Sequence, residues 1–369
     1  MQKKLIALAV AGLVSGGAFA QTNVTVSGLF RMSVEQYKAS STALNDSYNY
    51  NAVSDQSSML VFSGREDLGG GMYAGFQIDN RFGGDMGGFA ASGNTNVHVG
   101  GNWGRVAMGR QDLHYGSAIE SYKAYTLQNI LSNGIFAQVA GNTVAVGSRT
   151  PNVVMYDSPN MSGFSARLAM SSAFRATEGT GVRAVGAVDP SKGSATNLAL
   201  NYANGPIKAG YSYWRGTTEG GKGATAATAD QRGDTLQFGY TFPMGVAVGL
   251  GWNKSKLETT LGEASRTAWL LPISYTFGAN QVAFTYARAN NLSGSLAAGV
   301  SDTGANAYTL AYGYSLSKRT NLGVAYTKLD NKTNGTYDLF AIGANGGVST
   351  ATIPGSDVTQ VSFNLNHSF

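Results

Sequence analysis

The residues of this chain that could do chemistry are few, and they do not form a catalytic set. The chain has three histidines, His98, His114 and His367, and no cysteine. His114 lies close to Asp112, so a serine–histidine–aspartate site is the strongest catalytic candidate, but the two residues are merely neighbours in one polar segment. Spacing typical of zinc ligands is absent. The sequence therefore predicts no catalytic residue, no metal ligand and no cofactor.

Two further motifs fail on their surroundings. Segment 216–222 resembles a phosphate-binding loop, but Gly223 stands where serine or threonine is required, and no helical pattern follows. An isoelectric point near 9.2 would suit nucleic-acid binding, yet the basic residues are scattered singly along the chain. We therefore expect no nucleic-acid partner.

A group of charged residues suits ion selection better than catalysis. Rings of charged side chains inside a pore select the ions that pass. The candidates for such a constriction are Arg31, Arg81, Arg149, Arg167, Asp79, Asp112 and Glu120. The arginines fall on the polar positions of alternating segments, so their role depends on what those segments form.

Short segments along the chain alternate apolar and polar residues, which is typical of β-strands with two different faces. In the last of them, Val361, Phe363 and Leu365 alternate with Ser362 and Asn364. A soluble sandwich also alternates, but here the polar faces are neutral and only 13% of the chain is charged, against roughly 25% in soluble domains. Aromatic residues gather beside the short turns and again toward the long loops, as at the two interfaces of a membrane barrel.

The connections alternate between short turns and long polar loops. The short turns fall at 67–71, 102–104, 158–163, 204–206, 243–245, 278–280 and 317–319. The long loops fall at about 38–56, 83–94, 112–148, 173–195, 216–233, 254–266, 290–305 and 330–356. This rhythm predicts an all-β fold, a 16-stranded antiparallel transmembrane β-barrel with its long loops outside the cell.

Segment 112–148 is the longest internal stretch without alternation. A loop of this length in a compact domain is usually functional or disordered. Since sixteen strands would otherwise enclose a wide hole, we expect this third long loop to fold inward and narrow the bore. Asp112 and Glu120 would then face the arginines of the wall.

Residues 1–20 have the form of a secretory signal peptide. Lys3 and Lys4 precede a short apolar run, and Ala18 and Ala20 form a cleavage site. The run is too short to span a membrane. We expect cleavage after Ala20, which leaves a barrel over 21–369 and lowers the formal net charge from +5 to +3 because both lysines are lost.

Several stretches resemble the general porins of β-proteobacteria. They are GREDLGGGMYAGFQIDNRF (64–82), GNWGRVAMGRQD (101–112), VVMYDSPNMSGF (153–164), YSLSKRTNLGVAYTKL (314–329) and the terminal NHSF (366–369). The resemblance covers the whole mature chain. It implies a homotrimer in the outer membrane of a Gram-negative bacterium, amid membrane lipid and lipopolysaccharide, that lets ions and small hydrophilic solutes diffuse passively. It also implies that the barrel assembly machinery recognises Phe369.

Several members of that family are anion-selective through an arginine cluster at the constriction. Arg149 matches one of those arginines, whereas Met59 and the stretch 93–94 stand where two others are expected. Arg31 and Arg81 could supply the missing charge from neighbouring strands. The resemblance therefore implies a porin that is weakly anion-selective and is not an enzyme. A channel that prefers small organic anions or sugars is the alternative, and a lipase-like barrel enzyme is a remote one.

Overall fold

The computed structural model describes residues 23–41, 46–90, 93–113, 135–136, 150–172, 193–218, 230–337, 339 and 353–369. The expected signal peptide, Arg149, Glu120 and most of segment 112–148 lie outside these residues. Nearly all of the described chain is β-strand, and a short 3-10 helix, η3 (Ser295–Ala297), lies in one connection. No helix in this part of the chain is long and apolar enough to cross a membrane.

The strands follow one another along the chain with little else between them. The first nine are β1 (Asn23–Ser41), β2 (Asp46–Asp55), β3 (Met59–Gly69), β4 (Met72–Phe82), β5 (Phe89–Ala90), β6 (Thr95–Gly101), β7 (Gly104–Gln111), β8 (Thr150–Asp157) and β9 (Phe164–Ser171). The others are β10 (Gly193–Asn204), β11 (Ile207–Thr218), β12 (Asp230–Thr241), β13 (Val246–Thr259), β14 (Gly262–Phe277), β15 (Asn280–Ala289), β16 (Ala305–Ser315), β17 (Thr320–Asn331) and β18 (Ser356–Ser368).

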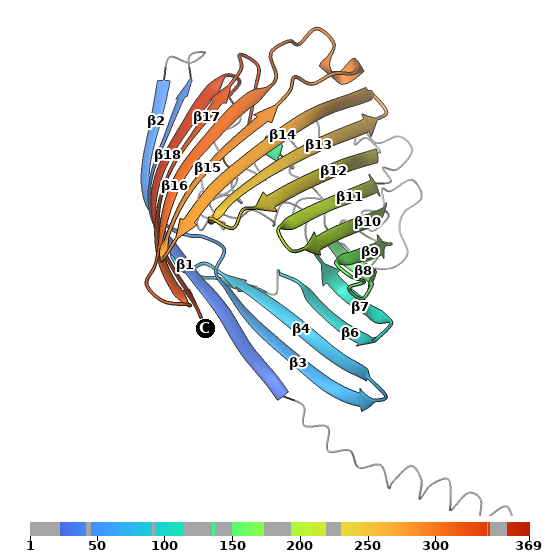
Figure 1. Cartoon of the computed structure of the whole chain (residues 1–369). Coiled ribbons are helices and arrows are strands. Elements are labelled where there is room, and N and C mark those ends of the chain that lie inside the picture. The colour runs from blue at the N-terminus through green and yellow to red at the C-terminus, as the bar shows by residue number, and fades with distance from the viewer. Residues whose placement is uncertain are drawn as a thin grey trace, which may run out of the picture.

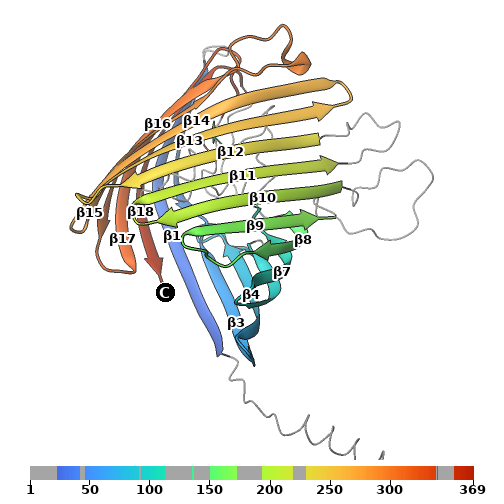
Figure 2. The ribbon, with the colours of Figure 1, turned by 45° about the vertical axis from the view of Figure 1, so that its right-hand side comes forward.

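These strands form one antiparallel sheet that closes on itself (Figure 1). Closure is made by β18, which pairs with β1 from Leu29↔Ser368 to Ser41↔Ser356. Both β2 and β3 pair with β1, so they act as a single wall strand interrupted at 56–58, and β5 is a two-residue strand beside β4. The wall is thus the predicted barrel of 16 antiparallel strands, and Figure 2 shows β9 to β14 side by side in it.

The alternation of the sequence becomes the two faces of the wall. In β18, Gln360 and Ser362 are buried on the inner face, whereas Phe363 and Leu365 are exposed on the outer face. Aromatic pairs sit at the short-turn end of the outer face, for example Phe164 with Tyr202 at a ring-centroid distance of 4.5 Å. A closed sheet pairs its own backbone groups, which lipid cannot do for an open edge.

Two expected loops prove to be strand. Within 38–56, β1 continues to Ser41 and pairs with β2, which runs from Asp46 to Asp55; within 254–266, β13 continues to Thr259, which pairs with Gly262 of β14. The prediction was wrong there because these strands continue beyond the apolar band of the wall. The outer face there is polar, for example at Lys38, Lys254 and Glu258, so the hydrogen-bond ladder continues without the apolar outer positions that marked the wall in the sequence.

The height of the wall is uneven. Strand β6 has 7 residues, and β7, β8 and β9 have 8 each. The strands from β10 to β18 have between 10 and 16 residues. We call the stretch β6–β9 the short wall.

The described residues of the third long loop lie against the inner face of the wall, in agreement with the predicted inward fold. Leu113 is fully buried and packs in one cluster with Val153 and Met155 of the inner face of β8. Ile135 and Phe136 are also fully buried, in a second cluster that contains Leu270 of the inner face of β14. The loop therefore touches the wall at β8 and again at β14, on another side of the bore.

Candidate functional site

The first charged cluster lies on the inner face of β4. Nη2 of Arg81 donates to Oδ2 of Asp79 at 2.8 Å, and its Nη1 donates to the hydroxyl of Ser57 at 2.8 Å. Asp79 is 4% exposed, so this ion pair is largely desolvated. A buried carboxylate next to a guanidinium is compensated rather than free to attract ions. This cluster adds little net charge to the bore.

Arg31 extends this first cluster from β1. Its backbone carbonyl accepts from the amide of Gln56 at 3.0 Å, and its backbone amide donates to the hydroxyl of Ser58 at 3.0 Å. Its guanidinium is close enough to that of Arg81 and to the carboxylate of Asp55 to interact with both. The interruption between β2 and β3 thus binds Arg31 on one side and Arg81 on the other.

A chain of contacts leads from Asp79 to the start of the inward loop. The amide of Gly93 donates to the carbonyl of Asp79 at 3.0 Å, and a Cβ atom on Gly93 would lie 1.9 Å from the Cγ of Asp79. Next along the chain, Oδ1 of Asn94 accepts from the amide of Asp112 at 2.7 Å. The stretch 93–94 therefore holds Asp79 and Asp112 in place, and its glycine leaves room for a carboxylate.

The second charged cluster lies nearer to the short turns. Asp157 of β8 accepts from Nη2 of Arg105 at 2.7 Å and from Nε of Arg167 at 2.5 Å. The strand register explains the cluster, since Asp157 pairs with Arg105 on one side and with Arg167 on the other. Two guanidinium groups share a single carboxylate here, so this cluster carries a surplus positive charge.

Arg167 also holds the inward loop. Its Nη1 donates to the carbonyl of Asp112 at 3.1 Å, although Arg167 lies near the short turns and Asp112 follows the opposite end of β7. The chain must therefore turn back into the bore directly after β7. Arg167 and Asp112 are brought together, but through a backbone carbonyl rather than as an ion pair.

The far attachment of the loop combines a buried aromatic contact with a hydrogen bond from an arginine. The ring of Phe136 lies against Gly251 of β13, where a Cβ atom would come within 2.9 Å of its Cζ. Nη2 of Arg266 in β14 donates to the carbonyl of Phe136 at 3.1 Å. The guanidinium of Arg266 also lies 5.4 Å from the ring centroid of Tyr337. This attachment fixes the loop against the wall on the side away from the two charged clusters.

Five of the seven residues proposed from the sequence are described. Arg31, Arg81 and Asp79 belong to the first cluster, and Arg167 and Asp112 meet beside the second. Arg149 and Glu120 lie outside the described residues. Among these five residues, the arginines and carboxylates are interleaved on one side of the bore rather than set against each other across it.

Sequence reasoning missed the residues that complete these clusters. Arg105 and Asp157 each lie directly beside a short turn. Their opposite charges at paired positions of β7 and β8 were the pattern from which this contact could have been predicted. Glu35 of β1 is 2% exposed and accepts from the hydroxyl of Ser33 at 2.6 Å. In the sequence, only its position on the inner face pointed to it. Phe136 and Arg266 had none, because they are 130 positions apart in the chain.

The described histidines have neutral partners. Nδ1 of His98 lies 2.9 Å from Oδ1 of Asn96 on the inner face, and Nδ1 of His367 lies 2.9 Å from the hydroxyl of Thr320. His114 lies outside the described residues. Within the described ranges, no three histidine, cysteine, aspartate or glutamate residues are grouped as a metal site would require.

Comparisons with known proteins agree with this architecture. Outer membrane porin protein 32 of Delftia acidovorans is 30% identical over 100% of both chains. An outer membrane porin protein of Bordetella pertussis is 27% identical over 87% of this chain and 92% of its own. The solved structure of an anion-selective porin from Comamonas acidovorans matches with a TM-score of 0.74 and 25% identity, over 94% of this chain and 100% of that one.

The relatives are outer-membrane proteins of Gram-negative bacteria, and the closed barrel is the form in which strands cross that membrane. We therefore assign this protein to the outer membrane. A family model described as Gram-negative porin matches residues 7–334, which is most of the chain. The chain belongs to the Gram-negative porin family.

Proposed function

We propose that this porin is a weakly anion-selective diffusion channel for ions and small hydrophilic solutes and that it catalyses no reaction. The observation that carries the sign of the selectivity is Asp157, which two guanidinium groups share. The first cluster supports the weakness of the preference, because Arg81 is paired with Asp79 and Arg31 lies near Asp55. The solved relative described as anion-selective agrees with this sign.

Arg149 is the remaining candidate in this proposal. It matches an arginine of the family's constriction by sequence alone and adds a second source of positive charge. Together with Glu120 it completes the set from which we expect the narrowest point to be built.

Single-channel recording in a planar bilayer under a KCl gradient tests the proposal. We expect stable open channels with a small reversal potential of the sign that indicates anion preference. A reversal potential of the opposite sign would indicate that the carboxylates of Asp79, Asp112 and Glu120 determine the ion selectivity at the constriction. Absence of conductance from correctly folded barrels would remove the open-channel proposal and favour a plugged barrel or an enzyme.

We further propose that the protein is a homotrimer whose subunits meet at the short wall. A β-strand needs about 9–11 residues to cross the hydrocarbon layer, and β6 to β9 have 7 or 8. A wall that is too low for lipid is better covered by protein. Contact with a neighbouring subunit meets that need.

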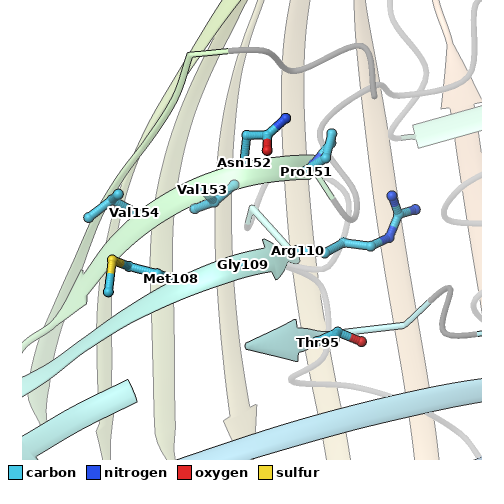
Figure 3. A pocket seen from close by; sticks show the side chains of 8 residues that line it. All are labelled: Thr95, Met108, Gly109, Arg110, Pro151, Asn152, Val153 and Val154. Carbon is cyan, nitrogen blue, oxygen red and sulfur yellow. The ribbon is translucent and has the colours of Figure 1, made fainter. Parts of the chain in front are cut away.

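The outer face of the short wall supports this role. A hollow of about 590 Å³ lies over β6, β7 and β8, with Met108 and Val154 toward one end and Arg110 and Thr95 toward the other (Figure 3). The hollow follows a register shift between β7 and β8, next to Asn152, whose φ is +54°.

Gel mobility of unheated protein, with chemical cross-linking, tests the trimer. We expect Met108→Lys to convert trimers to folded monomers. Leu236→Lys is the matched control, because Leu236 is 49% exposed on the outer face of β12 and Met108 is 53% exposed on β7. Intact trimers from Met108→Lys, or monomers from both variants, would contradict the placement of the contact.

Two expectations about biogenesis belong to the same proposal. Residues 1–20 act as a cleaved signal peptide, which N-terminal sequencing of the mature protein would test. Phe369 acts as the recognition residue for the barrel assembly machinery. Its backbone amide donates to the carbonyl of Gly28 at 3.1 Å, so the terminal residue also lies at the seam between β18 and β1.

A further inference from the structure

Three basic residues lie in line across the outer face of the barrel. Arg215 of β11 pairs with Arg232 of β12, and Arg232 pairs with Lys256 of β13. We call these three residues the cation row. Like charges directly opposite one another destabilise a sheet unless other charges compensate them. The positions of the carboxylates around the cation row therefore indicate on which side its charge is left uncompensated.

Compensation comes from the side of the long loops. The next outer-face positions toward those loops hold Asp230, Glu258 and Glu263, which we call the acid row. Arg215 forms an ion pair with Asp230, and Lys256 forms ion pairs with both glutamates. Arg232 reaches Glu258 at 3.4 Å. The acid row therefore compensates the charge of the cation row only from the side of the long loops.

The membrane side of the cation row has no such row of acids among the described residues. The next outer-face positions there are Asp234 and Lys254, which pair with each other across β12 and β13. Oδ1 of Asp234 already accepts from the hydroxyl of Tyr211 at 2.7 Å. Lys254 is exposed and adds a fourth cation. The described part of this side therefore offers cations with one carboxylate, which is already hydrogen-bonded.

Two tryptophans indicate where these cations lie along the barrel axis, relative to the membrane. Trp252 of β13 pairs with Trp269 of β14, and both lie on the outer face below Lys254. Tryptophan concentrates where the lipid tails meet the headgroups. Lys254 lies two positions beyond Trp252, about 6–7 Å along the strand. The cations therefore lie at the level of lipid headgroups on the long-loop side of the barrel.

We propose that the cation row and Lys254 bind the phosphate groups of lipid A, the membrane anchor of lipopolysaccharide. This inference rests on the outer-membrane location and on the long loops facing outward, where the leaflet consists of lipopolysaccharide. Guanidinium groups bind phosphate through two parallel hydrogen bonds, and an ammonium group adds a point charge. A phosphate between Arg232, Lys254 and Lys256 supplies the negative charge that the membrane side lacks.

Native mass spectrometry of the purified full-length porin tests the site with three probes: bisphosphorylated lipid A, dephosphorylated lipid A and phosphatidylglycerol. We expect binding of bisphosphorylated lipid A to fall roughly tenfold or more in Arg232→Gln/Lys254→Gln, since two surface cations are lost. Lys318→Gln/Arg319→Gln is the matched control. It removes two cations from the short turn at the opposite end of the barrel and leaves binding unchanged.

A second variant has the opposite expected sign. Glu258→Gln removes a carboxylate that competes for Arg232 and Lys256, so binding of bisphosphorylated lipid A should increase. Equal binding by the wild type and both site variants would overturn the proposal, as would equal preference for dephosphorylated lipid A or phosphatidylglycerol. Conductance is measured on the same samples. A variant that loses lipid A but still conducts separates this site from the proposed channel function.

Discussion

Phe136 is expected to decide how firmly the inward loop is held, and Phe136→Ala tests this directly. The side chain is fully buried, and its ring lies against the bare backbone of Gly251. Removing a buried phenylalanine ring costs about 3–5 kcal/mol. Phe136 belongs to the loop rather than to a wall strand, so we expect the cost to weaken the attachment of the loop and leave the barrel intact.

The size of the effect follows from that cost. At about 1.4 kcal/mol per tenfold change, a loss of 3–5 kcal/mol raises the population of the detached loop by roughly 10²–10³-fold or more. The hydrogen bond from Arg266 to the carbonyl of Phe136 is to the backbone and remains in the variant. We therefore expect the loop to exchange between attached and detached states. Single-channel recordings should show added open-channel noise, new conductance levels and a lower closing voltage.

Phe284→Ala is the control for that experiment. Phe284 is a phenylalanine on the outer face of β15, 39% exposed, so its removal changes the lipid contact and leaves the bore untouched. Unheated gel mobility confirms that both variants are folded. If Phe136→Ala matches the wild type in noise, conductance levels and closing voltage, the ring does not hold the loop and the reasoning from its burial is wrong.

Three further changes test the proposed selectivity and assembly. Arg149→Ser should shift the reversal potential under a KCl gradient toward cations, and an unchanged value would remove Arg149 from the constriction. Asp157→Asn should shift it toward anions, because two guanidinium groups lose the carboxylate that they share; a shift toward cations would refute the surplus-charge argument. Gly28→Val should lower the yield of heat-resistant barrels, since a Cβ atom there would lie 2.3 Å from the Cζ of Phe369, and wild-type yields would show that the seam tolerates the added bulk.

The wall was predictable because its cause is local. A strand between lipid and water must alternate apolar and polar residues, so the inner and outer positions of β18 can be assigned from the amino-acid sequence alone. The same reasoning placed Arg31, Arg81 and Arg167 on inner faces. It fails beyond the apolar band, where Lys254 and Glu258 both point outward and the strand continues without an apolar outer face. The strand ends at 38–56 and 254–266 were therefore misplaced.

The contacts of the site were not predictable in the same way, because their causes are distant in sequence. Asp157 meets Arg105 only because β7 and β8 pair in one particular register, across an interval of 52 residues. Phe136 meets Gly251 because a residue of the third long loop packs against a strand that lies more than a hundred residues further along the chain. Alternation assigns a face to each side chain, but it does not say which strand lies opposite.

The interleaving of charges on one wall gives a physical reason for weak selectivity. An arginine in a largely desolvated wall needs a carboxylate or several hydrogen bonds nearby, because an unpaired buried charge is costly. Arg81 meets this need with Asp79 and Ser57. Such a pair acts on a distant ion only as a dipole, and salt screens exposed charges beyond about 8–10 Å. Under the proposed function, the paired arginines therefore shape the bore, while the sign of the selectivity is left to the surplus charge around Asp157 and to Arg149.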